Sequence, residues 1–295
     1  FTPANWTYSG INALEGGTTN TATNSPFPIG TYSDSASSDP SMTISGVTNG
    51  QEFSPETTEV TVTFNIQNFT LSADNGSGGS DGSGDGYVLT TLQEPGEPDD
   101  VVGFFTTTPP PISVESGKTY TLTAELVDNS GNSLSPAVSV SASFSVAAYT
   151  EATNIAALRT GSDGDYFELT GEAVLTFIGT SRNQKYIEDS SAAILIDDNN
   201  GTITTSYSIG DGITGIKGRL SSFAGVTQFV PVEDPEAASS TGNAITPQTV
   251  SIAELLANLN DYESEWITIN DITFADGDGS ATFSTGSNYD ITDGT

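Results

Sequence analysis

The chain has 295 residues, a hydrophobic content of 35% and a formal net charge of −32, with six basic residues against 38 acidic ones. This length and apolar content predict two or three folded domains rather than a disordered polymer. The absence of cysteine excludes disulfides and thiolate metal sites, and the absence of histidine excludes Ser-His-Asp catalysis.

The basic residues are distributed unevenly along the chain. Residues 1–154 hold one basic and 17 acidic residues, and residues 155–230 hold five basic and nine acidic residues. Residues 231–295 hold twelve acidic residues and no basic one. The middle third is therefore chemically distinct.

No apolar run approaches the length of a membrane-spanning helix, so membrane insertion is not expected. No signal peptide is visible, as in a chain that has already been processed.

Residues 1–39 carry scattered aromatic residues between Pro, Gly, Asn and Thr, which predicts a loop-rich N-terminal segment. Residues 40–148 alternate between apolar and polar residues, which predicts half-buried antiparallel strands. We expect the clearest strands at 60–66, 120–126 and 138–146, and shorter ones at 41–45, 86–91 and 101–106. Six or seven short strands in about a hundred residues predict a β-sandwich.

Within this region, residues 72–87 read "SADNGSGGSDGSGDGY". The composition favours a long flexible loop between strands. The alternative is a calcium site formed by Asp74, Asp81 and Asp85 with backbone carbonyls, since calcium takes six to eight oxygen ligands from adaptable backbone. The spacing matches neither an EF-hand nor a nonapeptide repeat.

Residues 150–236 predict a second β domain. A helical turn at "NIAALR" precedes a long strand over 165–179, in which Gly171 allows the strand to bend and change its buried face. Four further strands are expected in "QKYIED", "AAILID", "GITGIKGRLSSF" and "VTQFVPV". Five strands of which the first is long and bent predict a small Greek-key barrel of the OB type.

The same residues carry a resemblance. The Gly-x-x-hydrophobic first strand, "YIED" and "GDGITGIKG" resemble the OB-fold modules of large secreted bacterial proteins, which occur beside extracellular nuclease domains, lamin-tail domains and type IX secretion signals. "TTEVTVTFNIQNFTLS" and "GKTYTLTAELVDNSGNSLSPAVSVSASFSV" resemble the Ig-like domain often found upstream. Over residues 40–236 the resemblance implies an all-β chain, in which an Ig- or fibronectin-like sandwich precedes an OB-type barrel.

The segment "KYIEDSSAAILIDDNNGT" holds four acidic residues, which could form a catalytic carboxylate cluster or could have structural roles. Glu188 and Asp189 end a short strand, and Asp197 and Asp198 flank a turn at Asn200-Gly201. Such positions place side chains on the solvent face or at turn corners, so a structural role is favoured over catalysis.

Residues 237–246 are a linker by composition, and residues 247–295 predict an incomplete second OB-like module. A helix is expected over 251–259, because Ser251 and Glu254 form a capping box. Its apolar stripe consists of Ile252, Leu255, Leu256 and Leu259. One strand over 263–274 should follow. Two or three strands are too few to close a barrel, so we expect further residues or a partner chain to supply the rest.

A second calcium candidate lies in "FADGDGSA", where Asp276, Asp278 and Ser280 occupy alternate positions. The segment lacks the central glycine and the distal glutamate of an EF-hand, so a hairpin turn is favoured. On this reading no cofactor is required, and calcium is the candidate ion for both loops.

OB barrels commonly bind single-stranded nucleic acid, and Tyr186, Phe223 and Phe229 are candidate stacking residues. Each third of the chain carries a net negative charge, which disfavours the binding of nucleic-acid phosphate. We expect the basic residues of the middle third to pair with neighbouring acids instead.

The sequence therefore predicts a non-catalytic segment of a secreted or cell-surface protein, serving adhesion, spacing or assembly. Its expected partners are extracellular proteins, glycans or copies of itself. The alternative is an accessory region of an extracellular nuclease or other hydrolase whose catalytic domain follows residue 295.

Overall fold

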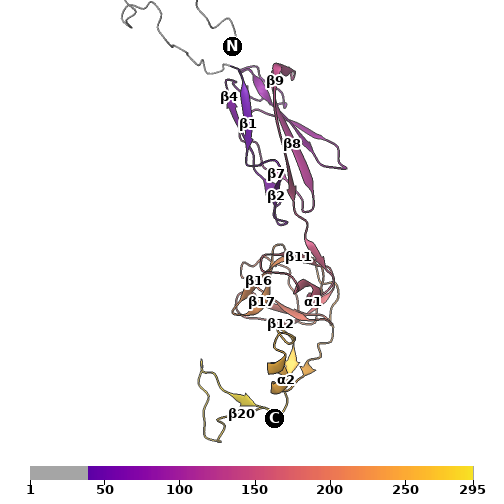
Figure 1. Ribbon diagram of the computed structural model, residues 1–295, viewed down its shortest axis with the longest axis vertical. Helices are drawn as coiled ribbons and strands as arrows, with labels where there is room; N and C mark the ends of the chain where they lie inside the picture. The colour runs from indigo at the N-terminus through magenta and orange to yellow at the C-terminus, as the bar shows by residue number, and fades with distance from the viewer. Residues whose placement is uncertain (1–38, 295) are drawn as a thin grey trace, which may run out of the picture.

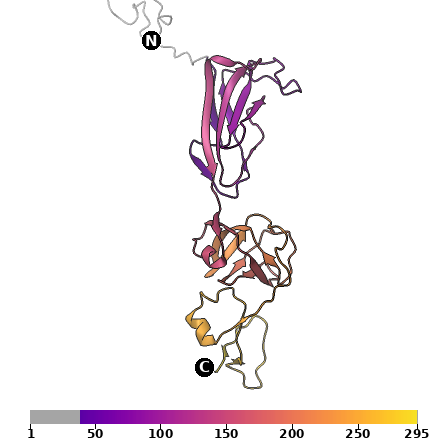
Figure 2. The same ribbon diagram turned by 90° about the vertical axis from the view of Figure 1, so that its right-hand side faces the viewer.

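The computed structural model describes residues 39–294, so the loop-rich segment expected at 1–39 lies outside it except for its last residue. The described chain is predominantly β-structure. Three modules follow one another along the longest axis (Figures 1 and 2): the N-terminal module (39–148), the middle module (150–236) and the C-terminal module (245–294).

The N-terminal module packs two small strand pairs over a larger sheet. The larger sheet has the order β2-β9-β8-β5-β6, while β1 pairs with β4 and β3 with β7. Phe64 on β4 and Phe144 on β9 are both 1% exposed and belong to one hydrophobic core. The strands are β1 (Ser41–Ser45), β2 (Gln51–Phe53), β3 (Glu59–Val60), β4 (Thr63–Gln67), β5 (Gly86–Gln93), β6 (Asp100–Phe104), β7 (Ile112–Ser113), β8 (Thr119–Asp128) and β9 (Ser133–Val146).

The two long strands predicted at 120–126 and 138–146 are confirmed as β8 and β9, and the short ones as β1, β5 and β6. The single strand expected over 60–66 is wrong. Two strands occupy this stretch, because β3 pairs with β7 whereas β4 pairs with β1. The predicted buried face is nevertheless correct, since Val60, Val62 and Phe64 are all buried.

The middle module is a curled sheet with a short helix. The strand order is β10-β11-β16-β17-β14-β13-β12-β15. Because β11 and β12 are close in sequence but lie near opposite ends of this order, the sheet curls back on itself. Its elements are β10 (Thr150–Ala152), α1 (Ile155–Leu158), β11 (Tyr166–Leu169), β12 (Ala173–Ile178), β13 (Lys185–Glu188), β14 (Ala193–Ile196), β15 (Gly212–Ile213), β16 (Ile216–Phe223) and β17 (Val226–Pro231).

The long strand expected over 165–179 is divided into β11 and β12 at the glycine that was predicted to bend it. A Cβ atom on Gly171 would lie 2.1 Å from the carbonyl oxygen of Thr153, so only glycine fits between the two strands. Phe167, Leu169 and Leu175 are buried in the core of the curled sheet.

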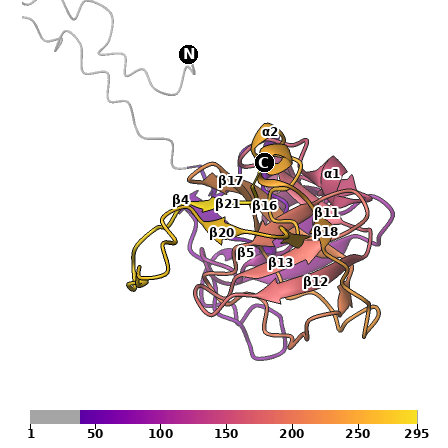
Figure 3. The same cartoon turned by 90° about the horizontal axis from the view of Figure 1, so that it is seen from below.

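The C-terminal module has very short elements. They are β18 (Gln248–Thr249), α2 (Ile252–Ala257), β19 (Ile267–Thr268), β20 (Thr273–Phe274) and β21 (Ile291–Thr292). The expected helix is confirmed, but the one strand expected over 263–274 is wrong. Asp271 adopts a φ of 54°, which interrupts an extended strand between β19 and β20. The loop that joins β20 to β21 extends away from the rest of the molecule (Figure 3).

The predicted linker at 237–246 is not a free connection. Its backbone forms a β-bridge from Ser240 to Gly212 of β15. The Gly212 N–H donates to the Ser240 carbonyl and the Ser239 N–H donates to the Gly212 carbonyl (both 2.8 Å). Asn243 adds a backbone hydrogen bond to Gly210 (2.8 Å), and Ser239 Oγ donates to Glu172 (2.6 Å). The segment therefore extends the edge of the middle module.

Candidate functional site

Asp198 lies at the centre of a buried polar network in the middle module. It is 1% exposed, although its place beside a turn predicted an exposed side chain. Lys185 Nζ lies 3.1 Å from Oδ2 of Asp198, and the Thr202 N–H donates to Oδ1 (2.7 Å). Lys185 also donates to the carbonyl of Asn183 (3.0 Å). The predicted place at a turn corner is correct, since the Gly201 N–H donates to the Asp198 carbonyl (2.9 Å). The side chain does not face solvent, because the preceding strand β14 is buried along its whole length.

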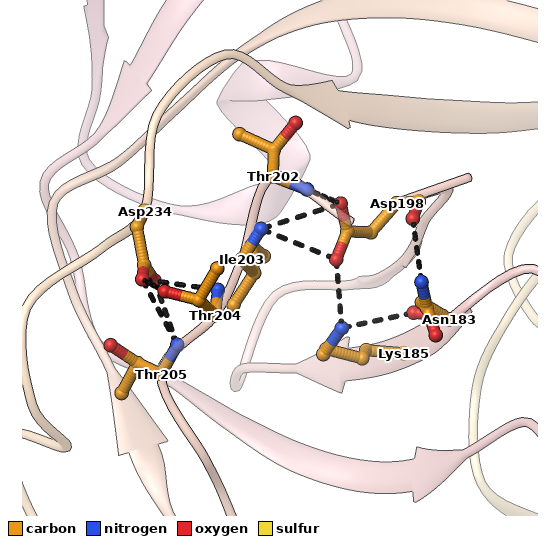
Figure 4. Close-up of polar contacts among 8 residues, drawn as sticks. All are labelled: Asn183, Lys185, Asp198, Thr202, Ile203, Thr204, Thr205 and Asp234. Atoms are coloured by element: carbon orange, nitrogen blue, oxygen red, sulfur yellow. Dashed lines mark hydrogen bonds and ion pairs between the residues drawn. The ribbon is translucent and has the colours of Figure 1, made fainter. Parts of the chain in front are cut away.

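Two carboxylates hold the loop that follows this turn (Figure 4). Asp198 accepts the N–H groups of Thr202 and Ile203, and Asp234 accepts those of Thr204 and Thr205. Asp234 also accepts the hydroxyl of Thr204. Four consecutive backbone donors of an irregular segment are therefore satisfied by two aspartates. This arrangement gives both carboxylates a structural role.

The other basic residues are paired in the same way. Asp197 is 7% exposed and receives two hydrogen bonds from Arg182 (3.1 and 2.5 Å). Ion pairs occupy five of the six basic residues in the described chain: Lys118 with Glu94, Arg159 with Glu263, Arg182 with Asp197, Lys185 with Asp198, and Lys217 with Glu233. The pairing with neighbouring acids that was expected for the five basic residues of the middle module is confirmed for four of them, Arg159, Arg182, Lys185 and Lys217.

Asp189 caps a helix rather than lying free at a strand end. Its Oδ2 accepts the N–H of Ile155 at the start of α1 (2.8 Å), and its Oδ1 accepts the N–H groups of Ser191 and Ala192 (2.7 and 3.1 Å). Asn154 satisfies a further donor of the same helix (2.8 Å). The predicted structural role of Asp189 is confirmed.

A cleft of about 470 Å³ lies where this helix end meets the linker. Three carboxylates line it: Glu172, Glu188 and Asp189. Glu172 accepts a serine hydroxyl and Asp189 caps α1, as described above. The remaining lining residues are Thr153, Asn154, Gly171, Val174, Thr176, Ser190, Ala244, Ile245 and Thr246.

The junction between the middle and C-terminal modules contains a pair of glutamates. The Trp266 N–H donates to Oε2 of Glu188 (3.1 Å), while the neighbouring Glu265 has a buried Oε2 without a hydrogen-bond partner in residues 39–294. Burial, reinforced by the charge of Glu188, raises the pKa of Glu265 to about 7, although Arg159 opposes the shift. Glu265 therefore exchanges its proton close to neutral pH.

Further contacts fix the same junction. Arg159 donates to the carbonyl oxygens of Asn260 (3.1 Å) and Glu263 (3.4 Å). The side chain of Glu263 accepts the N–H of Thr227 (2.8 Å) and lies 3.4 Å from Arg159. The C-terminal module is thus bound to the middle module by a definite set of polar contacts.

The three candidate stacking residues differ in exposure. Phe229 is 0% exposed in the core, which excludes it as a stacking residue, whereas Phe223 is 73% exposed. Tyr186 packs edge-on against Phe177 (5.8 Å between ring centroids), and Phe177 stacks on Trp266 (6.3 Å). These rings form part of the junction, a contact between segments too distant in sequence for local patterning to reveal.

The junction between the N-terminal and middle modules is also polar. Tyr166 Oη donates to Oε1 of Glu56 (2.7 Å), and the ring of Tyr149 lies edge-on to Tyr166 (6.3 Å). Lys217 lies 5.5 Å above the Tyr149 ring and 3.0 Å from Glu233. Burial, together with Glu233 and Glu56, raises the pKa of Tyr149 to about 12.

The first calcium candidate is a loop between β4 and β5, as predicted, and it folds back on itself. Asp74 accepts two backbone N–H groups (2.8 and 3.1 Å), as does Asp81 (2.8 and 3.1 Å), and Asp85 accepts one (2.7 Å). Asn129 accepts two serine hydroxyls of the loop (2.6 and 2.5 Å). Asp74 therefore supports a local turn, whereas Asp81 and Asp85 also join the two sides of the loop through Ala73 and Thr70.

In the second candidate, Asp278 accepts the N–H and hydroxyl of Ser280 (both 2.8 Å), and these hydrogen bonds lower the pKa of Asp278. The predicted turn is present, and Asp276 precedes it. Within residues 39–294, no group of three or more acidic side chains is placed to hold a metal ion together. Calcium binding at either segment stays a prediction.

Comparisons with known proteins leave the family open, since no protein-family model and no curated protein matches the chain. Among the described residues, no helix is both long and apolar enough to cross a membrane.

Proposed function

We propose that the chain is a non-catalytic spacer and assembly segment of a secreted or cell-surface protein. It comprises an Ig-like sandwich, an OB-type barrel and the opening of a second such barrel. The observation that carries this proposal is that modules with separate hydrophobic cores are joined end to end through specific polar junctions.

The strand pairing supports these finer assignments. A five-stranded sheet packed against two strand pairs suits an Ig- or fibronectin-like sandwich. In the middle module, the parallel pairing of β14 with β17 inside an otherwise mainly antiparallel curled sheet suits a Greek-key barrel of the OB type. Net charge of −32 suits a protein that must stay soluble outside the cell.

Small-angle scattering of the full chain tests the spacer function. We expect an elongated profile that persists because both junctions are fixed. Replacing Tyr166 by Phe and Arg159 by Ala should broaden the distribution of interatomic distances, since each change removes contacts between modules. Lys118→Ala is the matched control, because its ion pair lies within the N-terminal module. A compact wild-type profile, or equal broadening in the control, would contradict the proposal.

An activity assay tests the non-catalytic assignment. The chain is expected to leave DNA and polysaccharide uncut. Glu188 and Glu265 are the pair to probe, because a carboxyl group of raised pKa beside a second carboxyl group is an arrangement that acid–base hydrolysis can use. Turnover that disappears in both Glu188→Gln and Glu265→Gln would overturn the assignment.

A further inference from the structure

The C-terminal module is docked on the middle module through one short stretch of chain, residues 260–266, which we call the docking segment. The hydrogen bonds between the two modules within residues 39–294 all involve this segment: Arg159 donates to the carbonyls of Asn260 and Glu263, Thr227 donates to the Glu263 side chain, and Trp266 donates to the Glu188 side chain. The Trp266 ring also stacks on Phe177. Docking therefore depends on a few residues.

The docking segment brings carboxyl groups together with little positive charge to offset them. Glu265 faces Glu188 at the end of β13 and the adjacent Asp189. Arg159, which follows α1, is the cation that acts on Glu265. Arg159 also lies 3.4 Å from the side chain of Glu263, so two acidic residues of the segment share its charge. With every carboxyl group ionised, the docked arrangement carries an excess of negative charge.

Hydrogen bonding at Glu265 also calls for a proton. The Oε2 atom of Glu265 is buried and has no hydrogen-bond partner in the described part of the chain. The carboxyl group of Glu188 lies within hydrogen-bonding reach of Glu265. Two ionised carboxylates only accept hydrogen bonds, so a bond between them requires a proton on one of the two. A proton on Glu265 supplies that bond and removes one negative charge.

The docked segment also carries unfavourable local features. Ser264 adopts a φ of 68°, which is costly for a residue with a side chain, and its hydroxyl is buried without a hydrogen-bond partner in residues 39–294. Both features are relieved when the segment leaves the middle module. These costs weaken docking, so the contribution of a single proton matters to the balance.

We propose that a proton shared between Glu188 and Glu265 holds the C-terminal module on the middle module, and that loss of this proton releases the docking segment. The released module stays attached through residues 237–246, whose hydrogen bonds to the edge of the middle module involve neither glutamate. The inference rests on the proposed spacer function and deepens it, because the arrangement of the last two modules becomes dependent on pH. The fixed scattering profile expected above then belongs to the docked state at pH 5.

The direction of the change follows from the environment of Glu265. Burial in the docked state, reinforced by Glu188, raises its pKa from 4.5 to about 7. Release returns the carboxyl group to water and its pKa to the ordinary range. The docked state thus binds the proton more tightly, and docking weakens as the pH rises from 4.5 to about 7. We expect a docked segment at pH 5 and a released one at pH 8.

Amide hydrogen exchange of the full chain at pH 5 and pH 8 tests the proposal, with each rate divided by the intrinsic rate at that pH. The reporters are the amides of Thr227 and Trp266, because each donates to a carboxylate across the junction. The Leu220 amide, which donates to the Asp165 carbonyl inside the middle module, is the internal reference. We expect at least tenfold less protection of both reporters at pH 8, and no change at Leu220.

Glutamine variants identify the groups responsible. Glu265→Gln should keep both reporters protected at pH 8, because its amide is uncharged and donates a hydrogen bond to Glu188. Glu188→Gln removes the other half of the pair and should have the same effect, which keeps the test valid if one variant does not fold. Glu125→Gln on β8 of the N-terminal module is the control and should behave as wild type.

Three results would overturn the proposal: equal protection of the wild-type reporters at both pH values, release at pH 8 that persists in both glutamine variants, or a loss of protection at Leu220 equal to that at the reporters. The first of these would leave the spacer function standing, since junctions that stay fixed at every pH are compatible with an elongated chain. A compact scattering profile at pH 5 would instead contradict the spacer function, so the two proposals fail separately.

Discussion

Lys185 and Asp198 form an ion pair of 3.1 Å in which the lysine side chain is 12% exposed and the aspartate side chain 0%. The pair joins β13 to the turn after β14, and the same carboxylate fixes the loop at Thr202 and Ile203. Removing one partner leaves the other charge without compensation in a poorly solvated place.

Asp198→Asn is therefore expected to lower the free energy of unfolding by about 3 kcal/mol, the size found when one half of a buried pair is removed. Asp197→Asn is the matched comparison and should cost about 1 kcal/mol, because its partner Arg182 is 52% exposed and can be rehydrated. Urea denaturation of the two variants measures the difference. Equal losses would show that the burial of the Lys185 pair does not matter.

Stability should depend on pH through Glu265. Its pKa is raised from 4.5 to about 7 by burial and by Glu188. The folded state then binds this proton more tightly than the unfolded state, so the stabilisation is fully present below pH 4.5 and is lost as the pH rises to about 7. Glu265→Gln should remove this fall.

The measurement compares urea midpoints of wild type and Glu265→Gln between pH 4.5 and 8. Using the difference between the two cancels the titration of the other acids. Glu254→Gln is a control on α2, away from the glutamate pair. A wild type and Glu265→Gln that change in parallel with pH would show that Glu265 titrates like a solvent-exposed acid.

Gly171→Ala should destabilise the middle module by more than about 2 kcal/mol, because the new methyl group overlaps a backbone carbonyl that has little freedom to move. Gly179→Ala is the control. Its Cβ would lie 3.2 Å from the Cβ of Gln184, in a loop that has room to adjust. Thermal unfolding followed by circular dichroism compares them, and similar losses would argue against a special role for the closer contact.

Calcium remains the ion to test at the two acidic segments. If Asp74, Asp81 and Asp85 bind it, millimolar calcium should raise the melting temperature and a chelator should reverse the rise, because a ligand of the folded state stabilises that state. Asp81→Asn should reduce the response. A melting temperature that does not change up to about 10 mM calcium, the weak end of extracellular sites, would exclude binding.

Local periodicity was sufficient to predict elements that expose one face and bury the other. Val60, Phe64 and Phe144 were assigned to the core because alternation is a property of consecutive residues. Strands of two or three residues, such as β2 and β7, were missed because pairing with a distant strand defines them.

The polar contacts were harder to predict for the same reason. Asp197 and Asp198 look like turn residues, and only the covering structure shows that they are buried. Glu188 meets the backbone of Trp266, 78 positions away, through the docking of one module on another. No local sequence pattern can indicate a contact between residues so far apart in the chain.

The ion pairs have a consequence for proteolysis. Proteases that cut after lysine or arginine must draw that side chain into a pocket. Here those of Arg159 and Lys185 are 16% and 12% exposed, whereas that of Arg182 is 52% exposed in the turn before β13. Residues 220–295 contain neither residue type. Proteases that cut after aromatic residues find Phe283 62% exposed in the loop between β20 and β21. The first class should therefore cut at exposed positions such as Arg182 and leave residues 220–295 whole, whereas the second class should remove the C-terminal loop.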